Sequence, residues 1–438
     1  MIRKLLFLIG LFYGITLNAQ QELHLHFQRN IWQANRSNPA FLPDAKFVIG
    51  LPSIHNNLYL DGTNLSNLID TENRRLTLSN AIDDLEEANL FRNYFELETL
   101  SGGLYLGKLH LSLHHALKLN AYSDFPKELA QLITQGNAQF IGETVDISHD
   151  IDAFSYSEFG LGLGYQLSDN FSIGGRVKYL NGIGNISTSR NSLFLTTDED
   201  IYQLELNANY QIDASSLLLY NGLDAPEEIV QLGGLSLDEI LTANQGIAFD
   251  VGAHLQFENF DLAFSLLDIG QITWEENTRN YVANGTYEYG GLDLVNAFLE
   301  DSIAFSTVLD SLENIFAVQE TSNSYSTELP MRLYASFNYD LSDTWTAGLG
   351  VHGEWYRDAF FPALSFNAQT RLANFLRLGA NYTLFDNRYD HLGLNAQFQL
   401  GPIQAYAMAG NLLSAIRPRQ SSNVNVRLGV NLLFGRVE

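Results

Sequence analysis

The sequence contains no cysteine, and only 9 of its 438 residues are proline. Without cysteine the chain forms no disulfide, holds no metal through thiolates and has no cysteine nucleophile. Beyond the N-terminus, no apolar run approaches the ~20 residues that a membrane-spanning helix requires. Basic residues are also few, since 24 Lys and Arg stand against 50 Asp and Glu, for a net charge of −26. This acidity argues against nucleic acid or anionic lipid as a partner.

The first 19 residues have the layout of a secretory signal peptide. Arg3 and Lys4 precede an apolar core from Leu5 to Leu17, and Ala19 stands at the expected cleavage position. That core is too short to cross a bilayer as a helix. We therefore expect an exported mature chain that begins near Gln20; the alternative is a buried N-terminal strand or helix.

A period-two pattern dominates the C-terminal third of the chain. Between Thr344 and Arg357, apolar side chains occupy one face of an extended segment and polar or small ones the other. Such segments exceed the usual length of strands in soluble proteins. The connections alternate between short turns and long polar loops, as in outer-membrane barrels. The pattern predicts an all-β fold, a transmembrane antiparallel up-and-down barrel in the cell outer membrane; a soluble β-sandwich is the alternative.

The same template predicts about 14 wall strands along the chain. They are placed near 46–60, 94–107, 109–123, 152–167, 171–187, 246–257, 260–274, 328–340, 345–357, 360–372, 375–385, 389–400, 403–411 and 423–434. An even number leaves both termini on the periplasmic side. The first and last strands must pair, because lipid cannot satisfy an open strand edge.

Two tryptophans suggest where the wall meets the membrane interfaces. Trp345 and Trp355 share the apolar face of one predicted strand. Ten residues at about 3.3 Å each, tilted by about 40°, project to roughly 25 Å, the height of the lipid-facing band between aromatic girdles. We interpret the pair as part of that girdle; two core tryptophans of a sandwich are the alternative.

The stretch between the signal peptide and the first strand is predicted to be a plug. Residues 20–45 are not strand-like throughout, and Pro39 and Pro43 fix the approach of the chain to the wall. Asn38 begins an Asn-Pro-Ala turn, and Trp32 supplies an apolar anchor. We expect this segment to lie in the periplasmic mouth of a barrel formed by residues 46–438.

External insertions are expected near 61–93, 124–151, 188–245 and 275–327. Helices are predicted within them at Ser79–Leu90, Pro126–Gln135, Leu237–Thr242 and Leu292–Val318, with a hairpin around Thr197–Asp200. The stretch 191–245 has no Lys or Arg, which suits a solvated surface or a divalent-cation bridge to lipopolysaccharide. Ser302 and Ser311 stand in Asp-Ser-aliphatic tripeptides and are candidates for O-glycosylation.

Several charged and polar residues are assigned to the inner face of the wall. They are Arg176, Asp250, His254, Arg332, His352, Glu354, Arg371, Arg377 and Arg427. Lumen charges of this kind either tune the selectivity of a pore or form a packed ion-pair network. In the same register His115 falls on the lipid side, an anomaly that the sequence does not explain.

The sequence resembles a known group of barrels. Asn38-Pro39-Ala40 before the first strand is similar to an element of the long-chain fatty-acid transporter superfamily. The stretches FVIGLPSI, PKELAQLITQGNAQFIG and LLDIGQITW resemble an uncharacterised Bacteroidota outer-membrane barrel family that carries a domain of unknown function. The resemblance implies the barrel fold over the mature chain, and it links some relatives to type IX secretion and gliding.

No catalytic pattern is present. The sequence lacks a Gly-x-Ser-x-Gly elbow, a His-Glu-x-x-His pair and a phosphate-binding glycine loop. His24 and His26 alternate on a segment expected to be extended, where a solvated pair is favoured over a metal site. We therefore predict no enzyme activity, no cofactor and no metal site.

Two functions remain open. The first is a narrow or plugged channel for uptake or export of small compounds, hydrophobic ones among them. The second is a non-conducting docking barrel of a cell-envelope machine such as type IX secretion. The expected partners are outer-membrane lipid and lipopolysaccharide, with other envelope proteins added in the docking case, and nucleic acid is excluded.

Overall fold

The computed structural model describes residues 23–437, apart from residues 62, 64, 71–74, 77–80, 201, 218–240, 290–318, 358, 385–390, 413–415 and 417–421. The predicted signal peptide, residues 1–19, lies outside the described residues. So do the glycosylation candidates Ser302 and Ser311 and the predicted helix at Leu292–Val318.

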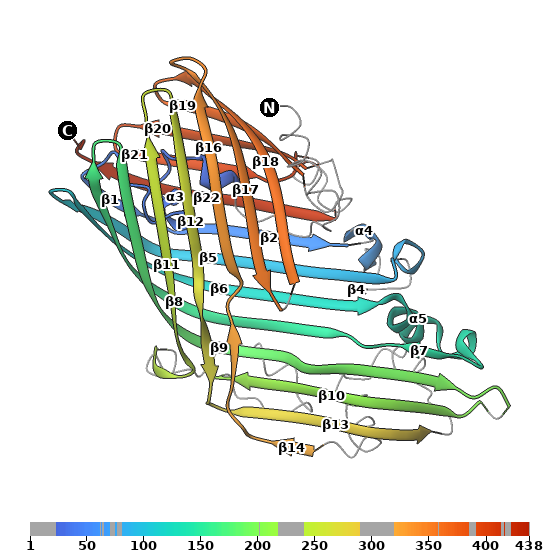
Figure 1. Cartoon of the computed structure of the whole chain (residues 1–438). Coiled ribbons are helices and arrows are strands. Elements are labelled where there is room, and N and C mark those ends of the chain that lie inside the picture. The colour runs from blue at the N-terminus through green and yellow to red at the C-terminus, as the bar shows by residue number, and fades with distance from the viewer. Residues whose placement is uncertain are drawn as a thin grey trace, which may run out of the picture.

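In the described part of the chain, 14 antiparallel wall strands close into a barrel (Figure 1). β1 and β2 together form the first wall strand, and both pair with β22, the last one. The wall consists of β1 (Phe47–Gly50), β2 (Ser53–Leu60), β5 (Ala88–Leu106), β6 (Leu109–Pro126), β8 (Asp150–Ser168), β9 (Phe171–Thr197), β11 (Gln245–Gln256), β12 (Phe260–Trp274), β16 (Met331–Asp340), β17 (Trp345–Tyr356), β18 (Ala359–Ala373), β19 (Leu376–Leu384), β20 (Leu392–Leu400), β21 (Ile403–Ala409) and β22 (Asn423–Phe434). The predicted fold is confirmed.

Each wall strand separates an apolar outer face from a polar or small inner face. On β17, Leu349 and Trp355 point outward and are 42% and 39% exposed, while His352 and Glu354 point inward and are buried. Trp345 is 49% exposed at the other end of the same strand. The apolar and polar positions that alternate in the sequence are therefore the outward and inward positions of the wall.

The predicted strand positions need three adjustments. The first wall strand is interrupted between β1 and β2 at Leu51 and Pro52, where proline has no N–H to donate to a ladder. β5 begins at Ala88 rather than near residue 94. β9 continues to Thr197, ten residues beyond its predicted end.

One side of the barrel is much taller than the other. β5, β6, β8 and β9 contain 19, 18, 19 and 27 residues, against 9 in β19 and β20. Beyond the barrel, β9 pairs with β10 (Leu204–Ser216) and β10 pairs with β13 (Thr278–Tyr289), which together form a sheet that projects from the external end (Figure 1). Shorter strands complete this region: β7 (Thr144–Asp146), β14 (Gln319–Thr321) and β15 (Tyr325–Glu328), with β3 (Ile69–Asp70) and β4 (Arg75–Leu76) as a separate pair.

The external insertions are less helical than predicted. α5 (Lys127–Gln135) and the β9–β10 hairpin confirm two predictions, and Gly136 ends α5 with a φ of +78°. The helix predicted at Ser79–Leu90 is wrong, because the described part of it contains one 3-10 turn, η1 (Ile82–Asp84), followed by β5. Where the structure describes 188–245 and 275–327, strands predominate.

The other helices are short. They are α2 (Leu23–Phe27), α3 (Ala34–Ser37), α4 (Leu65–Leu68) and the 3-10 turn η2 (Ala138–Phe140). In the described part of the chain, no helix combines the length and the apolar character needed to cross a membrane.

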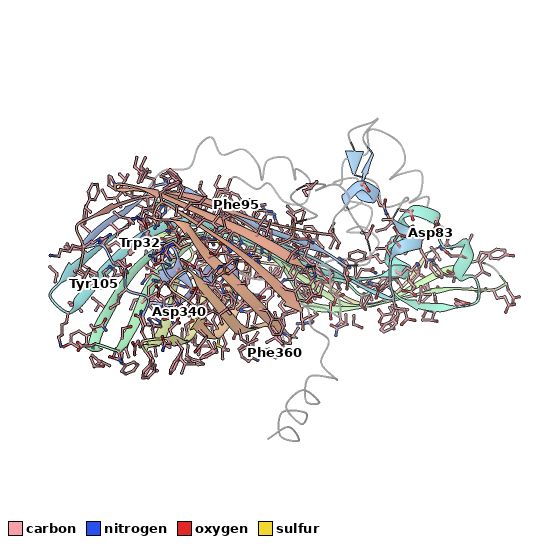
Figure 2. All side chains as sticks on the ribbon, turned by 90° about the horizontal axis from the view of Figure 1, so that it is seen from above. Trp32, Asp83, Phe95, Tyr105, Asp340 and Phe360 are labelled. Atoms are coloured by element: carbon pink, nitrogen blue, oxygen red, sulfur yellow. The ribbon has the colours of Figure 1, made fainter. Side chains whose placement is uncertain are left out.

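The N-terminal segment lies inside the barrel, where Leu25, Phe27 and Trp32 are buried; Figure 2 labels Trp32 at the same end of the barrel as Tyr105. Its residues 23–45 occupy the end of the lumen where the short turns lie, and α2 contacts β16, β17 and β18. His24 and His26 belong to α2, so the expectation of an extended pair is wrong. The segment contains both polar and apolar side chains, and the wall buries both kinds.

Above this segment the lumen holds two further layers. The first is a layer of buried ion pairs contributed by β5, β6, β8, β9, β11, β12, β16 and β22. The second is a cluster of mainly aromatic side chains toward the external end: Tyr59, Tyr122, Phe154, Tyr156, Leu180, Ala248, Ile272, Trp274, Leu329, Tyr356 and Phe361. The lumen is therefore filled along most of its length.

Candidate functional site

The Asn-Pro-Ala turn fixes the plug to the wall. The side-chain amide of Asn38 donates to the backbone oxygens of Ala253 (3.2 Å) and Phe264 (3.0 Å) on β11 and β12. Its oxygen accepts from the backbone N–H of Ala40 at 2.9 Å, which closes the turn. One buried asparagine thus satisfies backbone groups of both the wall and the plug.

Glycines in the wall allow the turn to approach this closely. A Cβ at Gly252 would stand 2.0 Å from Asn38 Oδ1, and a Cβ at Gly174 would stand 2.2 Å from the carbonyl oxygen of Pro39. Any larger residue at either position must displace the turn, because distances below 3.0 Å do not occur between such atoms. The plug and this part of the wall are therefore complementary in shape.

A second set of hydrogen bonds joins the plug to β5 and β22, the strands on either side of the first wall strand. Trp32 Nε1 donates to Ser101 Oγ at 2.8 Å, and Tyr105 donates its hydroxyl to the carbonyl oxygen of Pro43 at 3.0 Å, both on β5. Gln33 exchanges two amide hydrogen bonds with Asn431 on β22, at 2.8 and 2.9 Å. The segment thus bridges the two sides of the closing seam. Of the predicted plug residues, Trp32, Asn38 and Pro43 each form a hydrogen bond with the wall.

Charges and histidines complete the plug contacts. Arg36 Nε donates to Glu98 at 2.7 Å, and Arg29 pairs with Asp261 at 2.9 Å. His24 and His26 are buried, and His26 hydrogen bonds with Ser37 at 3.1 Å. Burial, together with the nearby His55, lowers the pKa of His24 to about 3. Burial, together with Arg29, holds the pKa of His26 well below its usual value.

The buried ion pairs converge on two aspartates. Arg176 Nη1 lies 2.8 Å from Asp250, and Lys178 Nζ lies 2.7 Å from Asp250 and 2.5 Å from Asp268. Arg332 also pairs with Asp268. Three of the predicted lumen residues, Arg176, Asp250 and Arg332, therefore meet in one cluster.

The same cluster supports an interruption of the wall. β12 pairs with β16 up to Leu267 and with β15 from Gln271, so that residues 268–270 face residues 329–331 between the two ladders. Asp268 has a φ of +59°, a conformation that aspartate tolerates better than most residues. Its backbone N–H donates to Asp250 Oδ1 at 2.9 Å. The ion pairs of Asp268 hold this irregular backbone in place.

A cavity of about 1330 Å³ lies at this interruption. Buried inner-face residues such as Asp152 and Tyr356 line it, and so do Phe249, Ile269 and Trp355, which are 48%, 38% and 39% exposed on the outer face. The cavity therefore reaches both faces of the wall. Asp150 and Arg357 form an ion pair (2.5 Å) at its external rim.

The remaining predicted lumen residues are distributed along the interior. Glu354 pairs with Arg92, Arg427 lies 3.5 Å from Glu96, and His254 lies 3.4 Å from Asp261. The ring of His352 hydrogen bonds with the carbonyl oxygen of Leu333 at 3.1 Å. Arg371 and Arg377 lie apart from these pairs, at the mouth that the plug occupies. Most lumen charges are thus paired as a packed network.

The outward position of His115 is explained by its neighbours. Its Nδ1 hydrogen bonds with Thr99 Oγ1 (2.7 Å), the extra residue of a β-bulge in β5, and its Nε2 with Ser157 Oγ (2.9 Å) on β8. Both ring nitrogens are therefore satisfied within the wall. Ser157 is 1% exposed, so its hydroxyl is no accessible nucleophile.

Sequence reasoning missed several residues of the site. Lys178, Asp268 and Glu98 each bind at least one predicted residue or plug residue. The adjacent Leu266 and Leu267 before Asp268 break the period of two, which was the available signal for a bulge. Among the described residues, no group of three or more His, Asp or Glu side chains could hold a metal.

A closed antiparallel barrel of 14 strands with its own N-terminal segment inside defines the class of this protein. The chain belongs to the Family of unknown function DUF5723, whose model matches residues 39–410. The predicted resemblance to a barrel family of unknown function is confirmed. None of the curated proteins matches the chain.

Several solved barrels are similar to the chain at low identity. The Ralstonia pickettii toluene transporter TbuX is 9% identical with a TM-score of 0.44, over 92% of this chain and 93% of that one. The P. putida toluene transporter TodX is 10% identical, with a TM-score of 0.42 over 92% and 94%. A Pseudomonas aeruginosa FadL homologue is 10% identical, with a TM-score of 0.43 over 96% and 100%.

Proposed function

We propose that the protein is an outer-membrane channel, closed at its periplasmic mouth by residues 23–45, that takes up small apolar or amphipathic compounds from the external side. The docked plug carries this proposal. Hydrogen bonds and two ion pairs hold the segment in the lumen. Its covalent link to the wall is the main chain at Lys46, because the sequence has no cysteine for a disulfide. Such a segment can be released while the wall stays closed.

The outer face of the barrel supports the membrane location. Large apolar side chains are exposed around the wall, among them Leu113, Leu163, Phe264, Leu349, Phe366 and Leu394. On β17 the band is bounded by Trp345 and Trp355, both exposed at the two ends of one strand. Apolar bands flanked by aromatic residues are what lipid-facing barrel walls present.

The cavity at the wall interruption supports the class of compound. Its lining combines apolar and aromatic groups such as Phe249, Leu329 and Trp355 with the carboxylates of Asp150 and Asp152. Ligand sites commonly join mainly apolar linings to a few polar groups. Because the cavity reaches both faces of the wall, a compound held by lipid or by water can enter it.

Deletion of residues 20–40 tests the proposal. The deleted protein is inserted into planar bilayers, and its single-channel conductance is compared with that of the full-length mature chain. We expect the deletion to raise conductance, because β1 begins only at Phe47 and the wall is retained. Resistance of the barrel to unfolding in gels is the control for assembly. A folded, deleted barrel that stays closed would contradict the channel.

The substitution Asn38→Leu repeats the test in a full-length chain. It removes the amide that bonds Ala253 and Phe264 and keeps a side chain of similar size. We expect brief openings rather than a permanent pore, since Trp32 and Gln33 still hold the segment. Arg279→Gln, on β13 and away from the plug, serves as the control with unchanged conductance.

A docking barrel is the second candidate, and the projecting sheet favours it. β9, β10 and β13 continue beyond the barrel wall as a surface on the external side (Figure 1). A barrel that only docks partners would stay closed after deletion of residues 20–40 and would co-purify with other envelope proteins. The conductance measurement therefore separates the two functions.

A further inference from the structure

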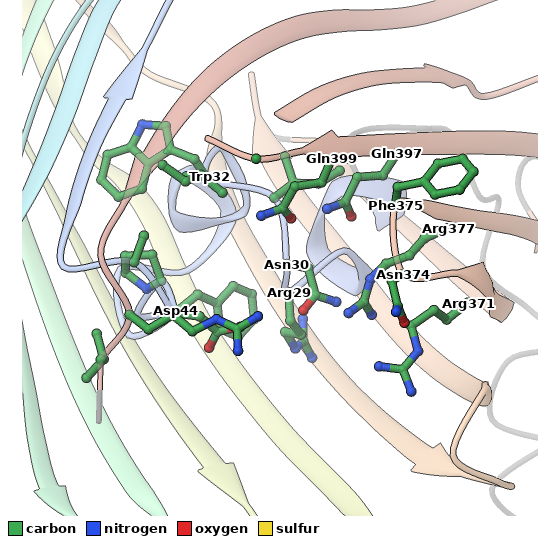
Figure 3. Close-up of a pocket in the computed structure, with 18 of the residues that line it drawn as sticks. Arg29, Asn30, Trp32, Asp44, Arg371, Asn374, Phe375, Arg377, Gln397 and Gln399 are labelled. Atoms are coloured by element: carbon green, nitrogen blue, oxygen red, sulfur yellow. The ribbon is translucent and has the colours of Figure 1, made fainter. Parts of the chain in front are cut away.

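A pocket of about 970 Å³ opens at the periplasmic mouth, between the plug and the turns of the wall (Figure 3). Four arginines line it, Arg29, Arg371, Arg377 and Arg436, and Asp44 is the one carboxylate among its lining residues in the described chain. This charge is opposite to that of the chain as a whole, which is −26. The pocket is therefore a local concentration of positive charge.

Two of these arginines face each other across a strand pair. Arg371 on β18 and Arg377 on β19 are direct partners in the antiparallel ladder. Like charges in directly opposite positions destabilise a sheet. Among the described residues neither forms an ion pair, and the one polar contact of Arg371 is a hydrogen bond to the backbone oxygen of Asp343 at 3.1 Å. Arg371 is exposed and Arg377 is half-buried, so within the described chain neither has the ion-pair partner that most of the buried lumen charges have.

Neutral hydrogen-bond donors surround the pair. Gln397 is the ladder partner of Arg377 on β20, and Gln399 follows on the same face. Figure 3 shows these amides and both guanidinium groups around the same space, whereas the ring of Phe375 points away from it and packs on Phe398. The pocket therefore offers hydrogen-bond donors around both guanidinium groups, and apolar residues such as Phe41 and Leu433 line another part of it.

We propose that this pocket binds a small organic carboxylate, with its carboxylate group between Arg371 and Arg377 and within reach of the amides of Gln397 and Gln399. Guanidinium groups bind carboxylates through paired, charge-assisted hydrogen bonds. A bound anion would also remove the repulsion between the two strands. The site is separate from the external cavity and is expected whether the lumen conducts or not.

Calorimetric titration of the detergent-solubilised mature protein with benzoate tests the site. We expect the wild type to bind benzoate and to ignore benzamide, its neutral counterpart. Arg371→Gln and Arg377→Gln should each weaken benzoate binding by about tenfold or more. Arg279→Gln, on the external strand β13 where Arg279 pairs with Glu320 at 2.9 Å, is the control with unchanged binding.

Thermal unfolding gives a second readout that a structural role would not produce. Without ligand, Arg377→Gln should be at least as stable as the wild type, because it removes an uncompensated like charge. With benzoate, the wild type and Arg279→Gln should gain stability and Arg377→Gln should not. The proposal is overturned if the wild type does not bind benzoate, or if the double variant Arg371→Gln/Arg377→Gln binds it equally well.

Discussion

The two halves of the lumen are filled in different ways. The half at the short-turn end, which is the periplasmic half in the proposed orientation, is filled by a separate segment, residues 23–45, which meets the wall through hydrogen bonds and a glycine-lined surface. The external half is filled by side chains of the wall itself, with Phe154, Tyr156 and Trp274 at the centre. Only the first filling can leave without taking the wall apart.

Under the proposed function, this difference places the releasable part of the barrel at the end where the short turns lie. Removing an aromatic side chain from the external cluster enlarges a cavity but leaves the strands in place. Loosening the plug empties the half of the lumen that residues 23–45 occupy. A variant in each half should therefore separate stability of the wall from closure of the lumen.

The largest effect is expected from Glu98→Gln in the periplasmic half. Glu98 accepts hydrogen bonds from Arg36 (2.7 Å), Gln33 (3.1 Å) and Ser101 (2.8 Å) and is 1% exposed. Loss of its charge leaves Arg36 buried and unpaired, which typically costs about 3–5 kcal/mol. We expect plug release, measured as protease cleavage before Lys46 and as open-channel time.

Phe154→Ala is the matched variant in the external half. It removes a buried side chain at a similar cost of about 3–5 kcal/mol and has no contact with the plug. We expect a lower unfolding midpoint and an unchanged cleavage pattern. If Phe154→Ala released the plug as readily as Glu98→Gln, the two halves would not be independent.

A smaller effect is expected at two neighbouring residues of β17. Leu349 is 42% exposed on the outer face, so Leu349→Arg should destabilise the barrel in lipid by about 2–4 kcal/mol. A Cβ at Gly348 would stand 2.4 Å from Asn338 Oδ1 and 3.0 Å from the ring of Phe27. Gly348→Arg should therefore displace α2 and raise conductance while insertion continues. Equal tolerance of both changes in an insertion assay would refute the assigned faces.

The smallest effect, taken over a single pH unit, concerns the plug histidines. The pKa of His24 is about 3 in the folded chain, below its usual value of 6.5. Above pH ~6.5 the imidazole of His24 is neutral in both the docked and the released segment, so the docked state has its full stability. As the pH falls toward 3, His24 takes up a proton only in the released segment. Docking should therefore weaken by about 1.4 kcal/mol per pH unit in this window.

Conductance at stepwise lower pH measures this effect. In His24→Gln, conductance should rise less steeply as the pH falls, because one of the two histidines no longer contributes. The remaining rise should come from His26, whose pKa is also lowered. A wild-type channel that opens more readily at high pH than at low pH would contradict the sign.

The sequence was sufficient for the wall but not for its irregularities. Alternation over long segments specifies strands and their faces, because a lipid-facing side must be apolar at every second position. A bulge shifts that period at one residue, as at Thr99 and Asp268, with little change in composition. The charge partners of Arg332 and Arg427 depend on register between distant strands, which local pattern does not contain.

The plug and the projecting sheet show two other limits. Residues 23–27 read LHLHF, a period of two, yet they form α2, because so short a helix is stabilised by its surroundings rather than by its own sequence. The stretch 204–216 also alternates, and it is a strand, β10, although it lies outside the wall. Alternation predicts a strand; it does not predict which sheet the strand joins.

The bond between Gln33 and Asn431 constrains the order in which this protein can assemble. The two residues are 398 positions apart, and Gln33 also reaches Glu98 on β5, so its contacts lie on both sides of the seam where β1 and β2 meet β22. Those contacts cannot all exist until the last strand has been synthesised and has closed the ring. Because pairings of such large sequence separation form slowly, we expect plug docking and ring closure to be one late kinetic event rather than two.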